Sequence, residues 1–171
     1  FFERFLNYFF SAEDADFYKA CGFNCLRLPV NYRHFEDDQN PFRYKEEGFA
    51  ALKRVIDLCS ARGIYTVIDL HAVQGYQNQD WHSDNPTHKA FFWDHPHFQE
   101  RYYRLWQEIS RRFKSSEYVA GYDLINEPGD VDGDKIKGIY EKTIKLIRQN
   151  GDEHIIFLEG NRYASDFSKL T

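Results

Sequence analysis

The sequence predicts an α/β fold in which short buried strands alternate with amphipathic helices. Stretches with apolar residues at helical spacing take turns along the chain with short apolar runs such as IYTVIDLH, residues 64–71. Unbroken apolar runs of this length are typical of parallel strands covered on both faces. Polar and aromatic residues gather after the runs, whereas the turns before them are short. We therefore expect a series of βα units with a parallel sheet.

The first unit begins with a helix over residues 11–20. Ser11 suits the N-cap, and Asp14 follows three residues later, as in a capping box. The run NCLRLPV, residues 24–30, is the first predicted strand. We expect Pro29 to end this strand, because proline cannot donate to a sheet ladder.

The remaining units follow the same order. Apolar spacing predicts helices over the ranges 48–62, 97–114 and about 135–149. Short apolar runs predict strands over the ranges 64–71, 118–125 and 154–161. The segment 72–96 shows no periodicity, and a loop of that length is usually functional.

Two architectures fit this order of elements. In a (β/α)8 (TIM) barrel the loops that follow the strands build the active site, and the ionisable residues of this chain gather in such loops. A complete barrel takes about 250 residues, so the 171 residues here would form a part of one. The alternative is an open parallel α/β sheet, which fits the length better but normally has a Gly-rich turn after its first strand. No such turn is present here, so we expect one domain over residues 1–171 with a partial barrel.

Composition excludes some functions and leaves localisation open. A net charge of −5 provides no basic stripe for a phosphate backbone, so we expect no nucleic-acid partner. The apolar runs are shorter than the roughly 20 residues that cross a bilayer, and no charged-then-apolar leader opens the chain. We expect no membrane anchor. The three cysteines, Cys21, Cys25 and Cys59, are expected to be reduced core residues.

Strand alternation predicts a cluster of charged side chains. Asp69 and Asp123 share the inner face of neighbouring strands, and Arg27 falls on the same face of the first predicted strand. A buried carboxylate is too costly without a partner, and Arg27 is the nearest cation by this reasoning. The arginine suits both a structural ion pair and a place in an active site.

The strongest candidate for chemistry is Glu127, at the carboxyl end of a predicted strand with Asn126 before it. The long loop adds candidates for sugar binding. Trp81 and Trp93 offer flat faces on which a sugar ring can stack, although packing beneath the loop is an equal alternative for each. His82 can bind hydroxyl groups.

Four segments of the chain resemble a known family of enzymes. The segment INEP, residues 125–128, resembles the acid/base strand of the retaining β-glycosidases that share a (β/α)8 barrel. Three more segments look like the second, third and fifth strands of glycoside hydrolase family 5, the cellulase-type family: GFNCLRLPVNY at 22–32, IYTVIDLH at 64–71 and FLEGN at 157–161. By this resemblance the chain holds strands two to five of the barrel.

The resemblance also implies roles for single residues. Arg27 would support the nucleophile, and His71 would line the subsite of the reacting sugar. Asn126 would bind the 2-hydroxyl group of that sugar, and Glu127 would be the acid/base. A retaining enzyme needs a second carboxyl group about 5 to 5.5 Å from the first. In this family that glutamate belongs to the seventh strand. Glu159 matches the fifth strand instead, so we expect the nucleophile outside this chain.

Three functional hypotheses follow. The first is hydrolysis of β-linked glucosides or β-glucans by double displacement, without a cofactor or metal. The second is a carbohydrate-binding barrel fragment that is catalytically incomplete. The third is a metal-dependent sugar isomerase or lyase on the same barrel, suggested by four histidines near the long loop: His82, His88, His95 and His97. It is disfavoured because metal sites of this type set their ligands at fixed short spacings, and Glu127 and His71 lack a second carboxylate ligand at such a spacing. The sequence leaves the oligomeric state open.

Overall fold

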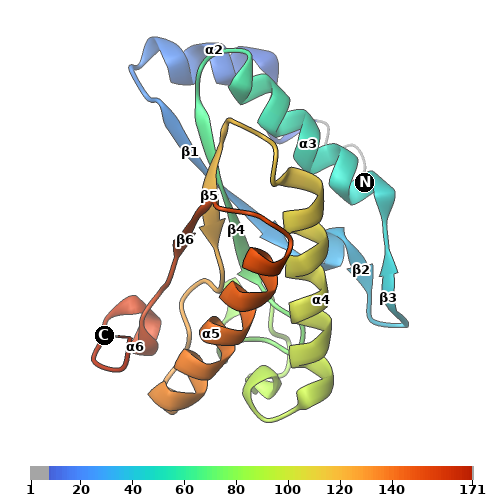
Figure 1. Ribbon diagram of the computed structural model, residues 1–171, viewed down its shortest axis with the longest axis vertical. Coiled ribbons are helices and arrows are strands. Elements are labelled where there is room, and N and C mark those ends of the chain that lie inside the picture. Colours follow the sequence, from blue (N-terminus) through green and yellow to red (C-terminus); the bar gives the residue numbers. More distant parts are fainter. Residues whose placement is uncertain (1–7, 171) are drawn as a thin grey trace.

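The computed structural model describes residues 8–170, and a parallel sheet of four strands lies at its centre (Figure 1). The order across the sheet is β1 (Cys25–Asn31), β4 (Tyr65–Ala72), β5 (Val119–Asp123) and β6 (Ile155–Phe157). The strands are joined in turn by α3 (Glu46–Ser60), α4 (Pro96–Phe113) and α5 (Gly133–Gln149). Strands that are neighbours in the chain are neighbours in the sheet, as in a barrel, whereas an open doubly wound sheet reverses its order at a switch point. The predicted partial barrel is confirmed.

The first helix, α2 (Ala12–Ala20), has the predicted capping box. The Ser11 hydroxyl accepts a hydrogen bond from the Asp14 N–H at 3.3 Å, and the Asp14 carboxylate accepts one from the Ser11 N–H at 2.8 Å. Two of the N–H groups that a helix start leaves unpaired are thereby satisfied. The helix begins where the sequence indicates, at the amino-terminal end of the sheet (Figure 1).

An aromatic core fixes α4 against the end of β5. Trp106, Tyr102 and Tyr122 are fully buried between the helices and the sheet. The indole N–H of Trp106 donates to the carbonyl oxygen of Leu124 at 3.2 Å, and the Tyr102 hydroxyl donates to the same oxygen at 3.4 Å. Both donors thus hold the backbone two residues before Asn126, so the helix positions the predicted site.

The structure corrects two predicted strand boundaries. β1 continues through Pro29 to Asn31. Among the described residues β1 pairs only with β4, and an edge strand tolerates the missing N–H of a proline. β6 is shorter than the predicted range 154–161, because the chain leaves the ladder after Phe157 and enters the short helix α6 (Asn161–Ala164).

A hairpin that the sequence did not reveal follows β1. It consists of β2 (Glu36–Asp37) and β3 (Asn40–Tyr44), which pair antiparallel beside the main sheet (Figure 1). A buried ion pair anchors it to α4, since the Arg101 Nε lies 3.0 Å from the Glu36 Oε2. The amide of Gln74, from the loop after β4, donates to the same oxygen at 3.0 Å. The network joins two loops at the carboxyl ends of the strands.

The cysteines differ from the prediction in part. Cys59 is buried, and burial raises the pKa of its thiol to about 11. Cys21 and Cys25 are exposed, so the prediction of a core position was wrong for them. All three are free thiols. None of the helices within residues 8–170 is both long and apolar enough to span a bilayer.

Candidate functional site

The predicted site residues gather at the carboxyl ends of the strands, around the guanidinium group of Arg27. Its Nη2 lies 3.1 Å from the Asp69 Oδ2 and 2.9 Å from the Asp123 Oδ2. Nη2 also donates to the Asn126 Oδ1 at 2.9 Å and to the Glu159 Oε1 at 2.8 Å. The meeting of Arg27, Asp69 and Asp123 that strand alternation predicted is therefore present, and Arg27 also orients the Asn126 amide.

Burial shifts the three carboxyl groups of this cluster toward their neutral forms. It raises the pKa of Asp69 against the opposing effects of His71 and Arg27. The pKa of Asp123 is raised by burial and then by the Asp69 carboxylate. Burial also raises the pKa of Glu159 to about 6, against the lowering effect of the Glu127 N–H. One guanidinium group does not neutralise three carboxylates, so the cluster favours holding protons.

Glu159 holds the backbone of Glu127 in place. Its Oε2 accepts a hydrogen bond from the Glu127 N–H at 2.7 Å, while its Oε1 accepts from Arg27. The phenol of Tyr140 in α5 donates to the Glu159 carbonyl oxygen at 2.9 Å. Both carboxylate oxygens are thus occupied by donors. In the sequence this residue was recognised by its place at a strand end and by the resemblance of FLEGN to the fifth strand of the family, and neither indicated its contact with the Glu127 backbone.

His71 is held in one orientation by the carboxylate of Asp69. The His71 Nδ1 lies 2.8 Å from the Asp69 Oδ2, the oxygen that Arg27 also contacts. A carboxylate beside Nδ1 requires a proton on that nitrogen, which leaves Nε2 of the neutral ring as an acceptor for a ligand hydroxyl. The side chain is partly exposed, so a ligand can reach it.

The loop after β4 is built around the amide of Gln77. The Gln77 Nε2 donates to the carbonyl oxygens of His71 at 2.8 Å and of Asn126 at 2.9 Å. The Trp93 indole donates to the Gln77 carbonyl oxygen at 2.8 Å, and this tryptophan is buried. Trp93 therefore packs beneath the loop, whereas Trp81 is 85% exposed and presents a free face.

Glu127 stands at the rim of this loop with its side chain 42% exposed. Its Oε2 lies 3.1 Å from the Nε2 of His82, and the same nitrogen lies 2.9 Å from the Nδ2 of Asn78. The Asn78 Nδ2 also donates to the Glu127 carbonyl oxygen at 2.9 Å. The backbone of Glu127 is left-handed, with φ of 44°. The sequence did not indicate that Asn78 contacts His82 and Glu127, because there it is one of several amides in a polar loop.

Tyr163 from α6 completes the rim. Its phenol donates to the Asp80 Oδ2 at 2.7 Å, and its ring centre lies 6.1 Å from that of His82. The hydrogen bond to Asp80 raises the pKa of Tyr163 to about 12. Sequence reasoning missed this residue because it comes from the far end of the chain and joins the rim only through tertiary contacts.

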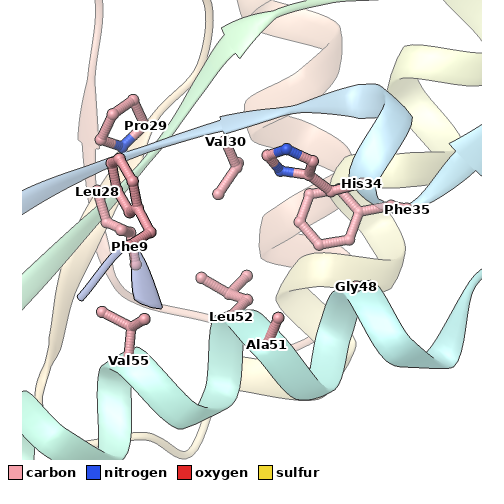
Figure 2. Close-up of a pocket in the computed structure, with 10 residues that line it drawn as sticks. All are labelled: Phe9, Leu28, Pro29, Val30, His34, Phe35, Gly48, Ala51, Leu52 and Val55. Carbon is pink, nitrogen blue, oxygen red and sulfur yellow. The ribbon is translucent and has the colours of Figure 1, made fainter. Parts of the chain in front are cut away.

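An apolar hollow of about 130 Å³ lies apart from this site, between β1 and α3 (Figure 2). Leu28 and Val30 line it from the strand, with Leu52 and Val55 from the helix. These strand residues alternate with Arg27, so the hollow lies on the opposite face of the sheet from the charged cluster. Within residues 8–170 no group of three or more histidine, cysteine or acidic side chains has the geometry to hold a metal ion.

Comparison with known protein families settles which family this architecture represents. Residues 5–171 match the family model described as cellulase, glycosyl hydrolase family 5. The chain belongs to glycosyl hydrolase family 5. This family-5 chain is 51% identical over 168 residues to a β-xylosidase from Phanerodontia chrysosporium, and it covers 35% of that protein. It is 26% identical over 157 residues to endoglucanase C from Acetivibrio thermocellus, of which it covers 44%. The resemblance found in the sequence is confirmed.

Solved structures agree with the fold. A glycoside hydrolase aligns over 90% of this chain with a TM-score of 0.77 and 24% identity, and the chain covers 47% of it. The endoglucanase Cel5A of Thermotoga maritima aligns over 95% with a TM-score of 0.75 and 23% identity, with 48% of that enzyme covered. Another structure of Cel5A contains cellobiose. The family-5 chain thus spans about a third to a half of the length of these relatives.

Proposed function

We propose that the full-length protein hydrolyses O-glycosidic bonds of β-linked glucosides or β-glucans by a retaining mechanism, with Glu127 as the general acid/base. The observation that carries this proposal is the position of Glu127. It lies at the carboxyl end of β5, its carboxyl group is exposed, and its neighbour Asn126 is held by Arg27. Cel5A, which shares this fold, has been solved with cellobiose, and this supports a β-glucan substrate.

The proposed chemistry proceeds in two steps. In the first, the carboxyl group of Glu127 donates its proton to the oxygen that leaves the sugar, while a nucleophile outside this chain attacks the anomeric carbon. In the second, the Glu127 carboxylate takes a proton from water, which then attacks the same carbon and releases the sugar. Because the Glu127 side chain is exposed, the leaving sugar oxygen and then the attacking water can both reach its carboxyl group.

Neighbouring side chains would hold the sugar. The Asn126 Oδ1 is occupied by Arg27, while its Nδ2 is buried and has no acceptor among the described residues. An unpaired buried donor of this kind suits a ligand hydroxyl, and we assign it to the 2-hydroxyl group of the reacting sugar. The Nε2 of His71 would bind another hydroxyl. Trp81 offers an exposed face for stacking, with His82 beside it.

Glu159 is a poor candidate for the nucleophile. Arg27 and the Glu127 N–H each donate to one of its two oxygens, so whichever oxygen attacked would have to give up its hydrogen bond. We therefore place the nucleophile outside the 171 residues. The alternative hypothesis, a carbohydrate-binding fragment without catalysis, then describes this chain on its own, and hydrolysis describes the longer protein.

The test is the effect of Glu127→Gln on aryl β-glucosides with leaving groups of graded quality, measured in the full-length protein. Removing the acid should lower turnover by about 10²- to 10⁴-fold for poor leaving groups and much less for good ones. Glu153→Gln is the control, because Glu153 is exposed at the opposite end of the sheet. Equal losses for all leaving groups would contradict the proposed role.

Two further measurements address mechanism and substrate. NMR of the first sugar released should show the β-anomer if the mechanism is retaining, and the α-anomer would exclude it. Because one relative is a β-xylosidase, aryl β-xylosides and cello-oligosaccharides should be assayed beside the β-glucosides. A clear preference for the xyloside would move the substrate class from β-glucans to β-xylosides.

A further inference from the structure

The side chains of Asn78, His82 and Glu127 form a hydrogen-bonded row that ends on the proposed acid. The His82 Nε2 lies 2.9 Å from the Asn78 Nδ2 and 3.1 Å from the Glu127 Oε2. One ring nitrogen therefore faces two neighbours. Glu127 can act as an acid only if the proton between its carboxyl group and the His82 ring lies on the carboxyl group.

The backbone fixes the orientation of the Asn78 amide. The Asn78 Oδ1 accepts a hydrogen bond from the Asp80 N–H at 2.9 Å, and the Asn78 Nδ2 donates to the Glu127 carbonyl oxygen at 2.9 Å. A backbone N–H only donates and a backbone carbonyl only accepts, so turning the amide over would break both bonds. Asn78 is fully buried, which prevents water from replacing them. The group that faces His82 is therefore an N–H donor.

A donor in that place determines the state of the ring. The His82 Nε2 must present its lone pair to Asn78, which holds the ring neutral with its proton on Nδ1. Glu127 faces the same lone pair, so it forms a hydrogen bond there only when its carboxyl group is protonated. The reverse arrangement, an imidazolium beside a carboxylate, would set the Nε2–H against the N–H of Asn78.

We propose that Asn78, acting through His82, keeps the proton on Glu127 so that the carboxyl group is protonated before the substrate binds. Both are positioning residues, because the proton passes from the Glu127 Oε2 directly to the departing sugar oxygen while His82 stays neutral. The carboxylate left behind then faces a lone pair, which favours its taking a proton from the attacking water. This inference rests on the proposed role of Glu127 and adds a part for His82 beyond sugar binding.

Other ionisable groups surround the row but are engaged elsewhere. The carboxylate of Asp80 accepts a hydrogen bond from the phenol of Tyr163 at 2.7 Å. Glu159 approaches Glu127 through the backbone N–H and is paired with Arg27. The proton on the row is thus governed by the contact of Asn78 with His82.

The test is nitrogen-15 NMR of the histidine rings in the 171-residue chain near neutral pH, with the His82 signals identified from their loss in His82→Gln. We expect a neutral ring with the proton on Nδ1. Asn78→Asp places a carboxylate oxygen before Nε2 and should move the proton onto that nitrogen. Gln79→Glu is the matched control, because it adds the same charge one residue away, where the side chain contacts Tyr163 instead, and it should leave the ring unchanged. A proton on Nε2 in the unaltered chain would overturn the proposal.

A second measurement covers the case in which Asn78→Asp does not fold. Infrared spectra of the unaltered chain, with Glu127→Gln as the blank, should contain the C=O stretching band of a protonated carboxyl group near neutral pH. His82→Phe removes the acceptor and should abolish this band, and its absence from the unaltered chain would refute the inference. Neither readout depends on turnover. If the full-length protein has a neutral His82 ring with the proton on Nδ1 but no glycosidase activity, the proposed function is refuted and this inference stands. If the full-length protein is active but carries the proton on the His82 Nε2, this inference is refuted and the proposed function stands.

Discussion

Arg27 binds three carboxylates and one amide with a single guanidinium group. A planar fork of donors can reach several oxygens at once, which a lysine ammonium group on a flexible stem cannot do in the same geometry. The arginine compensates the buried Asp69 and Asp123 and at the same time fixes the Asn126 amide. The structural and the functional interpretations of Arg27 therefore describe the same set of contacts.

Arg27→Met should lower the free energy of unfolding by about 2–3 kcal/mol near neutral pH, because it leaves buried carboxylates without a cation, and the partial exposure of Arg27 reduces the effect below that of a fully buried pair. Urea denaturation measures the change. The loss should shrink in acid, where the carboxyl groups with raised pKa values are already neutral. Arg104→Met, which removes an exposed pair with Glu100, is the control and should have little effect. A loss that does not depend on pH would contradict this explanation.

At the scale of elements, the approach of β6 to β5 depends on Gly121. A Cβ atom at this position would lie 2.3 Å from the carbonyl oxygen of Ile155 and 2.9 Å from the ring of Phe157. Backbone atoms cannot yield as a flexible side chain does, so only glycine permits this spacing. The spacing matters for the site, because β6 leads directly to Glu159.

Gly121→Ala should therefore displace β6 and lower the free energy of unfolding by about 1–3 kcal/mol, the usual cost of overpacking. Hydrogen exchange of the β6 amides should become faster. In Gly138→Ala, the control, the added methyl group meets nothing within 4 Å, and the change in a helix interior should stabilise the protein by about 0.5–1 kcal/mol. Unchanged exchange in β6 would show that the strand tolerates the larger residue.

The whole molecule shows the marks of a partial barrel. The sheet has four strands in barrel order, and Ile155 in β6 is 59% exposed although it is a strand residue. The chain covers 48% of the Cel5A structure that shares its fold. The carboxyl cluster at one end of this sheet makes the stability of the molecule depend on pH.

Glu159→Gln should isolate that dependence. The pKa of Glu159 rises from 4.5 to about 6 on folding. A carboxyl group whose pKa is raised contributes stability that is complete below its unfolded value and is lost as pH rises through its folded value. As pH rises from 4.5 to above 6, the free energy of unfolding of the unaltered chain should thus fall by about 1 kcal/mol relative to that of Glu159→Gln, after allowance for partial solvent screening. Urea denaturation of both proteins at several pH values tests this, and a difference that stays constant with pH would contradict it.

The sequence revealed the features that depend on local pattern. Helix spacing, apolar runs and the capping box at Ser11 fixed the order of elements, and strand alternation placed Arg27 with Asp69 and Asp123. Features that depend on distant partners were missed. The hairpin after β1 is short and polar, and it is held by Arg101, which lies 65 residues from Glu36 in the chain. The contact of Glu159 with the Glu127 backbone likewise joins residues that no local pattern connects.

The three tryptophans occupy very different surroundings. Trp81 is 85% exposed at the rim of the proposed site, whereas Trp93 is 5% and Trp106 0% exposed. A quencher dissolved in the buffer would therefore collide with one indole and spare the other two. The protein carries its own fluorescent reporter at the place where a sugar is proposed to stack, so a ligand that covers this ring would shield it from the quencher without any added label.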